Sequence, residues 1–248
     1  MASLDLAGLV RERILDSEGA ALAWLLLEGG VPLVVAGSAP AATRVDIAVA
    51  LLGAEPDRAW LVLDADEDPP TTERLGAIIA GGVSLGLTVG VRDLRTLLDS
   101  LTTTAGLPED AVRRLGLVAI VEATPVGPRI VALHYLRPTE RDAQGHVQRR
   151  PPAVLVTWDP ELDTFEHFAW GVTPELGDRV DRSQADLEER QRDRAAFIDV
   201  AARDGTAWMR SAPGYLAREP DRVPAPAHEP ATPSPFGSGL TDPDPLVH

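Results

Sequence analysis

The sequence contains neither cysteine nor lysine, and all 23 basic residues are arginine. The absence of cysteine excludes disulfide bonds, thiolate metal sites and a cysteine nucleophile. The absence of lysine excludes a Schiff base, a lysine general base and the lysine that reaches the β- and γ-phosphates in an active P-loop. The chain therefore cannot carry out catalysis that requires a cysteine or lysine side chain.

Long apolar runs are also missing. The longest, Ala20–Leu27 and Val31–Ala36, are far shorter than the roughly 20 residues that a membrane span needs. Met1–Leu9 has no cationic stretch leading into an apolar one, so we expect a cytoplasmic protein without membrane insertion. The formal net charge of -15 disfavours nucleic acid as a partner, because the field of the whole protein repels polyanions.

Apolar strand-like runs alternate with helical patterns in the first half of the chain. We predict buried strands at Val31–Ala36, Trp60–Leu63, Leu87–Val91 and Leu117–Glu122. The helices between and before them have N-cap candidates at Asp16 or Ser17, Thr71 and Asp93, and one helix is expected at Ala41–Leu52. This alternation favours an α/β fold with a mainly parallel sheet flanked by helices.

The pattern changes in the second half. Strand-like runs at Arg129–Leu136, Ala153–Trp158 and Thr164–Trp170 predict an antiparallel extension of the sheet, and Ser183 begins a charged helix. The expected organisation is a segment at 1–15, an α/β core at 16–124, the antiparallel extension at 125–175, a helical region at 176–212 and a disordered Pro-rich tail at 213–248.

The loop after the first strand has the position of a P-loop but not its residues. A P-loop reads G-x-x-x-x-G-K-[ST] between a strand and a helix, so that backbone N–H groups surround the phosphates. Gly37 matches the first glycine of the motif and is followed by Ser38. Ala42 stands at the position of the second glycine, Thr43 at that of the lysine, and Arg44 at that of the Ser or Thr whose hydroxyl binds magnesium. Gly37, Ser38, Ala42, Thr43 and Arg44 are therefore the candidates for a vestigial phosphate loop.

The first helix, the run Gly30–Gly37 and the loop and helix after it resemble the nucleotide-binding core of bacterial type II and type IV secretion ATPases, and above all a short, secretion-ATPase-like P-loop family. The likeness covers roughly residues 15–200. Later segments that carry it are His134–Pro138, Gly145–Arg149, Thr157–Asp159 and Phe165–Gly171. The resemblance implies a RecA-like, three-layer P-loop NTPase fold.

The resemblance also identifies a second degenerate motif. Secretion ATPases carry a Thr-x-His-Ala segment at the end of a later strand. The corresponding stretch is Thr88–Asp93, where Gly90 and Arg92 take the places of threonine and histidine and one residue is deleted. Such ATPases form rings in which neighbours supply arginines, so Arg129, Arg137 and Arg141 are candidates for that role.

Acidic residues follow the second predicted strand. Asp64, Asp66 and Glu67 lie where a Walker-B-like strand end holds Mg²⁺ in an active NTPase, and they are the candidate metal ligands. The alternative interpretation is a solvated strand terminus before Pro69-Pro70.

Histidines and aromatic residues of the second half form no recognisable catalytic motif. His134, His146 and His167 match no metal-ligand spacing, so we expect structural roles. The aromatic residues Trp158, Phe165, Phe168 and Trp170 are expected to pack across strands.

Two functions remain open from the sequence. The first is an inactive, P-loop-like protein that acts by binding or scaffolding, without a cofactor, as a homo-oligomer or paired with an active relative. The second is a divergent enzyme that binds or hydrolyses ATP with Mg²⁺ and uses Arg44 in place of the lysine, because a guanidinium suits phosphate oxygens. A third interpretation is an ordinary α/β domain with an accidental likeness at the loop.

Overall fold

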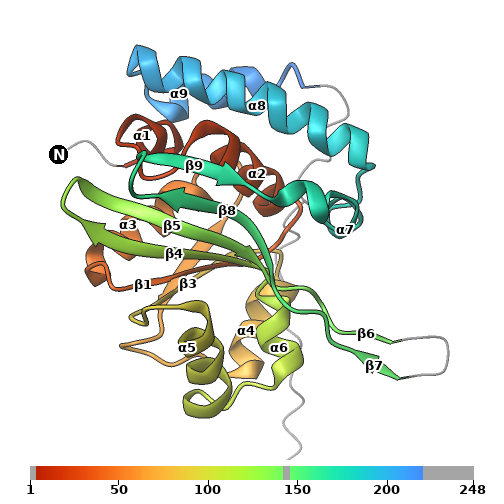
Figure 1. Ribbon diagram of the computed structural model, residues 1–248. Coiled ribbons are helices and arrows are strands. Elements are labelled where there is room, and N and C mark those ends of the chain that lie inside the picture. Colours follow the sequence, from red (N-terminus) through yellow and green to blue (C-terminus); the bar gives the residue numbers. More distant parts are fainter. Residues whose placement is uncertain (1–3, 142–145, 220–248) are drawn as a thin grey trace, which may run out of the picture.

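The computed structural model describes residues 4–141 and 146–219, and a seven-stranded sheet lies at its centre (Figure 1). The strands are ordered β2-β3-β1-β4-β5-β8-β9 across the sheet, and β6 and β7 form a separate short ribbon. The bounds are β1 Leu33–Gly37, β2 Trp60–Asp64, β3 Ser84–Val89, β4 Leu117–Thr124, β5 Gly127–Tyr135, β6 Glu140–Arg141, β7 Val147–Gln148, β8 Ala153–Asp159 and β9 Thr164–His167.

Helices begin where the sequence places capping side chains. Asp16, Thr71, Asp93 and Ser183 each accept a hydrogen bond from the backbone N–H three residues later, as predicted. No helix in the described residues is both long and apolar enough to cross a membrane. The bounds are α1 Leu6–Arg11, α2 Ser17–Glu28, α3 Ala41–Leu52, α4 Thr72–Ala80, α5 Leu94–Asp99, α6 Glu109–Arg114, α7 Thr173–Arg179, α8 Gln184–Asp204 and α9 Trp208–Leu216, with a π-helical turn at Ser100–Thr104 and a 3₁₀ turn at Ala169–Gly171.

The sheet is mixed rather than mainly parallel. The pairs β2–β3, β1–β3 and β1–β4 are parallel, whereas β4–β5, β5–β8 and β8–β9 are antiparallel. The short turn between Thr124 and Gly127 can only join antiparallel neighbours, because a parallel pair needs a crossover of a dozen or more residues. The expected α/β class and the antiparallel extension are confirmed.

Helices cover both faces of the sheet (Figure 1). Leu33 and Val35 of β1 face a core shared with α1, α2 and α3, and Val34 and Ala36 face a second core shared with α4, α5 and α6. Because both faces of β1 are buried, its sequence is continuously apolar instead of alternating. Both predicted ends of α3, Ala41 and Leu52, are confirmed.

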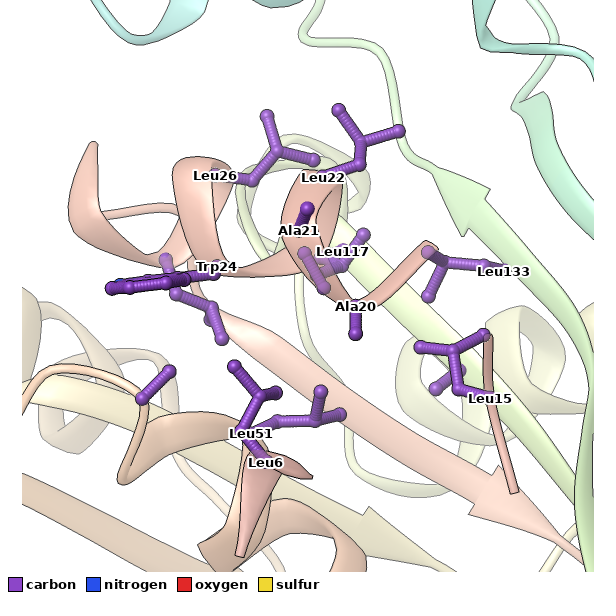
Figure 2. Close-up of a cluster of buried hydrophobic side chains, with 14 of the residues drawn as sticks. Leu6, Leu15, Ala20, Ala21, Leu22, Trp24, Leu26, Leu51, Leu117 and Leu133 are labelled. Carbon is purple, nitrogen blue, oxygen red and sulfur yellow. The ribbon is translucent and has the colours of Figure 1, made fainter. Parts of the chain in front are cut away.

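Helix α2 lies inside the larger core and is apolar on every side. Its residues from Gly19 to Leu27 are all buried, and Figure 2 shows the side chains of this cluster. A helix of this kind must be covered on more than one side. The sheet and α3 cover one side, and α8 and α9 form an outer layer over the other.

Buried charges fasten the outer layer to α2. The guanidinium of Arg194 in α8 is fully buried, and its Nη2 lies 2.7 Å from Glu28 Oε2 and 2.6 Å from Glu219 Oε2. It also stacks on the Trp24 ring at 4.1 Å from the centroid. Burial, followed by the charge of Glu219, raises the pKa of the neighbouring Tyr215 to about 12.

Two expected boundaries differ from the structure. The N-terminal segment 1–15 forms α1, whose Leu6 and Leu9 are buried in the same core as α2. The tail expected from Pro213 begins too early, since α9 continues to Leu216 and Glu219 binds Arg194. The prediction ended the helical region at residue 212 because Pro213 follows, although Trp208, Ala212 and Leu216 form a buried stripe at helical spacing. Residues 220–248 of the expected tail lie outside the described residues.

The strand β2 was predicted to be buried, and this is wrong. Its Trp60 and Leu61 are 42% and 39% exposed, because β2 is the first strand of the sheet and has a neighbour on one side only. The last predicted strand is also too long: β9 ends at His167, and the chain then turns into the 3₁₀ helix that contains Trp170.

Replacing Arg194 with methionine should lower the free energy of unfolding by about 3 kcal/mol. The substitution leaves the buried carboxylates of Glu28 and Glu219 without their principal cation. Urea unfolding followed by circular dichroism measures the effect. The control Arg192→Met, at an exposed position of the same helix, should change stability by less than about 0.5 kcal/mol. Equal effects of the two substitutions would contradict a stabilising role for the buried cluster.

Candidate functional site

The loop after β1 is a tight turn that depends on glycine. Gly37 has a φ of +143°, and a Cβ built on it would lie 1.8 Å from the carbonyl oxygen of Val121 on β4. Ser38 is exposed, Ala39 is fully buried with its N–H 3.4 Å from the same oxygen, and Pro40 immediately precedes α3. The turn therefore packs closely against the neighbouring strand.

Arg44 fills the inner side of this turn. Its side chain is buried, and Nη1 donates to the carbonyl oxygen of Ala39 at 2.7 Å and to that of Gly37 at 3.5 Å. A phosphate-binding loop directs backbone N–H groups inward. Here the carbonyl oxygens of Gly37 and Ala39 point inward instead, and both accept hydrogen bonds from the Arg44 guanidinium.

Asp66 completes the arrangement from the loop after β2. Its Oδ2 lies 2.6 Å from Arg44 Nη2, and its Oδ1 accepts the backbone N–H of Gly90 at 3.0 Å. A Cβ on Gly90 would lie 2.6 Å from the same Asp66 carboxylate, so only glycine fits without displacement. The three segments singled out in the sequence thus meet at one point: the loop with Arg44, the acidic run, and the degenerate motif with Gly90.

This point is the usual ligand position of an open α/β sheet. The strands β1 and β3 are parallel neighbours, and the helices that follow them, α3 and α5, lie on opposite faces. Ligands of such folds bind outside the carboxyl ends of strands where the connections diverge in this way. In this chain the Arg44–Asp66 ion pair occupies that position.

The candidate metal ligands do not gather around a common centre. Asp66 binds Arg44, and Asp64 Oδ1 accepts the backbone N–H of Asp66 at 3.1 Å. Within residues 4–141 and 146–219, no three side chains of His, Asp or Glu are placed to hold one metal ion, Glu67 included.

The remaining loop candidates leave the start of α3 open. Ala42 is exposed and Thr43 is partly exposed. Pro40 offers no side-chain hydrogen bond to the first N–H groups of α3. Free N–H groups at a helix start attract anions, so this end of α3 is a feature that suits a phosphate.

The histidines lie apart and have different surroundings. His134 lies on β5, where burial lowers its pKa. His146 is exposed. His167 at the end of β9 binds the N-cap of α2, with Nε2 2.7 Å from Asp16 Oδ2. A cavity of about 480 Å³ adjoins His167 and also includes Trp170, and its lining carries charges of both signs.

The other expected roles in the second half are met only in part. Trp158 and Phe165 are cross-strand partners, but Trp170 is 78% exposed. Arg129 is buried against Asp163, and Arg137 binds Glu175, so both cations have partners within the chain. The side chain of Arg141 lies outside the described residues.

No protein-family model matches the chain, and no curated protein matches it.

Replacing Gly37 with alanine should lower the free energy of unfolding by more than about 2 kcal/mol, because the new Cβ meets the Val121 carbonyl and the φ is unfavourable. Gly76→Ala is the matched control. Gly76 lies in α4 with open space around it, so alanine there should raise stability by about 0.5–1 kcal/mol. A Gly37→Ala protein as stable as the parent in urea unfolding would contradict the described turn.

The contact between His167 and Asp16 should make stability depend on pH. Burial lowers the pKa of His167, but the hydrogen bond to Asp16 and the charges of Asp16 and Glu18 outweigh burial, and the pKa is raised above the ordinary 6.5. A pKa raised on folding stabilises the fold fully below the unfolded pKa, and this stabilisation is lost as the pH rises through the folded pKa.

His167→Gln should therefore lower the free energy of unfolding more at about pH 5.5 than at about pH 8.5. His134→Gln is the control with the opposite sign, since the pKa of His134 is lowered and its protonation opposes folding. Urea unfolding at both pH values measures the two differences, and a His167 effect that is the same at both would contradict the assignment.

Proposed function

We propose that the chain is a P-loop NTPase-like protein that does not hydrolyse ATP and that acts by binding another protein. The observation that carries this proposal is the buried guanidinium of Arg44 in the loop, bound to the carbonyl oxygens of Gly37 and Ala39 and to Asp66. The resemblance to secretion ATPases suggests an active relative as the partner. The α/β sheet with helices on both faces supports the P-loop-like assignment as far as the class of fold.

The charges at the loop oppose nucleotide binding. A phosphate entering the turn would have to displace Asp66 from Arg44, to which it is joined by a charge-assisted hydrogen bond of 2.6 Å. The phosphate would also approach inward-facing carbonyl oxygens, which repel its negative charge. Asp64 and Glu67 lie nearby in the sequence and add like charge. The chain also has no lysine to bind the β- and γ-phosphates.

The alternative is an enzyme that binds ATP with Mg²⁺ through Arg44. The uncapped start of α3 favours this alternative, because its first N–H groups are suited to phosphate oxygens. It requires Arg44 to leave Asp66 and turn toward the ligand, and Asp66 then to become available to a magnesium ion.

Calorimetric titration should give no saturable heat with ATP or ADP and Mg²⁺ at about 1 mM, and a phosphate-release assay should give no turnover. Arg44→Ala is the control that locates any heat, since binding at the loop disappears in this variant and binding elsewhere does not. Saturable binding that Arg44→Ala abolishes, or phosphate release that Asp66→Asn abolishes, would establish the alternative and refute the proposal.

The binding role has its own test. The chain is mixed with an active secretion-ATPase-like relative from the same genome, and the mass of the complex is measured by size-exclusion chromatography with light scattering. The proposal predicts a complex that forms without nucleotide. Separate elution of the two proteins at about 100 µM would contradict this pairing.

A further inference from the structure

The outer side of β2 presents unpaired backbone groups. The carbonyl oxygen of Ala59 and the N–H of Ala65 bond to β3, so the residues at odd positions between them use their backbone groups for the β2–β3 pairing. The N–H and C=O groups of Trp60 and Val62 and the N–H of Asp64 therefore point away from the sheet, whereas the C=O of Asp64 already accepts the N–H groups of Glu67 and Asp68. In the described part of the chain, no strand pairs with this side.

Large apolar side chains lie exposed along the same edge. Trp60 and Leu61 are 42% and 39% exposed. Successive residues of a strand point to opposite faces, so Trp60 and Leu61 extend the apolar surface on both faces of the sheet. The segment Trp60–Asp64 contains no proline, and its pairing with β3 shows no bulge. Proline and a bulge, two of the usual devices that protect a sheet edge, are therefore missing, and the one charged side chain of the strand, Asp64, lies at its end.

From this edge we propose that two copies of the chain associate by antiparallel pairing of their β2 strands, with a two-fold axis at Val62. Residues 60, 62 and 64 then lie opposite residues 64, 62 and 60 of the second copy, which gives about four backbone hydrogen bonds, because the C=O of Asp64 is already used within each chain. The two sheets become one continuous sheet. The inference is independent of the loop at Gly37 and of the function proposed for it.

Charge selects the antiparallel arrangement of the two copies. The strand has an apolar start at Trp60 and an acidic end at Asp64, which Asp66 and Glu67 follow. Antiparallel pairing separates the two Asp64 residues by roughly 14 Å along the strands, which exceeds the Debye length of about 8 Å in physiological salt. Parallel pairing would place the acidic ends about 5 Å apart.

The second copy also supplies the apolar groups that the edge needs. Its own Trp60 and Leu61 add apolar side chains to both faces of the joined strands. A basic peptide would neutralise Asp64 but would leave these side chains in water. The interface is smaller than the usual 1,600 Å² or so, so we expect a dissociation constant of roughly 1–100 µM.

Sedimentation velocity between about 1 and 200 µM should show a monomer converting to a dimer. Two substitutions of Trp60 then test the register, since residue 60 lies opposite Asp64 of the second copy. Trp60→Asp should weaken dimerisation at least about 10-fold relative to the parent. Trp60→Lys removes the same aromatic ring but faces an opposite charge, and should dimerise at least about 10-fold more tightly than Trp60→Asp.

Trp170→Asp, at the most exposed tryptophan of the described residues, is the control and should leave the dissociation constant unchanged. Amide exchange adds a measurement on the parent protein, in which the N–H groups of Val62 and Asp64 should exchange more slowly as concentration rises. A chain that stays monomeric at 200 µM, a dimer unaffected by Trp60→Asp, or equal dissociation constants for Trp60→Asp and Trp60→Lys would each overturn the proposal.

Discussion

The candidate site depends on the hydrogen bonds and the ion pair that the Arg44 guanidinium makes. It joins the turn after β1 to the loop after β2 through the carbonyls of Gly37 and Ala39 and the carboxylate of Asp66. Asp66 in turn receives the N–H of Gly90 after β3. One cation thus holds together the carboxyl ends of three strands. Both charges of this contact, the Arg44 guanidinium and the Asp66 carboxylate, come from the chain itself.

The rest of the fold keeps the sheet rigid beneath this point. Both faces of β1 are buried, and α2 is enclosed between the sheet and the outer layer of α8 and α9. The outer layer is held by apolar packing and by the buried charges around Arg194. The fold closes the cores on both faces of the sheet with the chain's own helices. Its exposed apolar side chains include those at the β2 edge, where a second chain can extend the sheet.

Local signals in the sequence were sufficient for most elements. The caps Asp16, Thr71 and Asp93, and the apolar period of Ala41–Leu52, predicted their helices because these signals act within one turn. The exposure of β2 was not predictable, since an apolar run does not reveal whether its strand lies at an edge. The pairing of Arg44 with Asp66 was missed for a related reason. The two residues are 22 positions apart, and only the strand order brings them together.

A double-mutant cycle at Arg44 and Asp66 tests the central claim most directly. Arg44→Met, Asp66→Asn and the double variant are unfolded in urea, and the three losses of stability are compared with one another. If the ion pair closes the loop, the stability losses of the two single variants should sum to more than the loss in the double variant. The difference should be at least about 1 kcal/mol, as for residues in direct contact. Losses that add to within about 0.3 kcal/mol would mean that the two side chains do not interact, and would contradict the account of a loop closed by its own arginine.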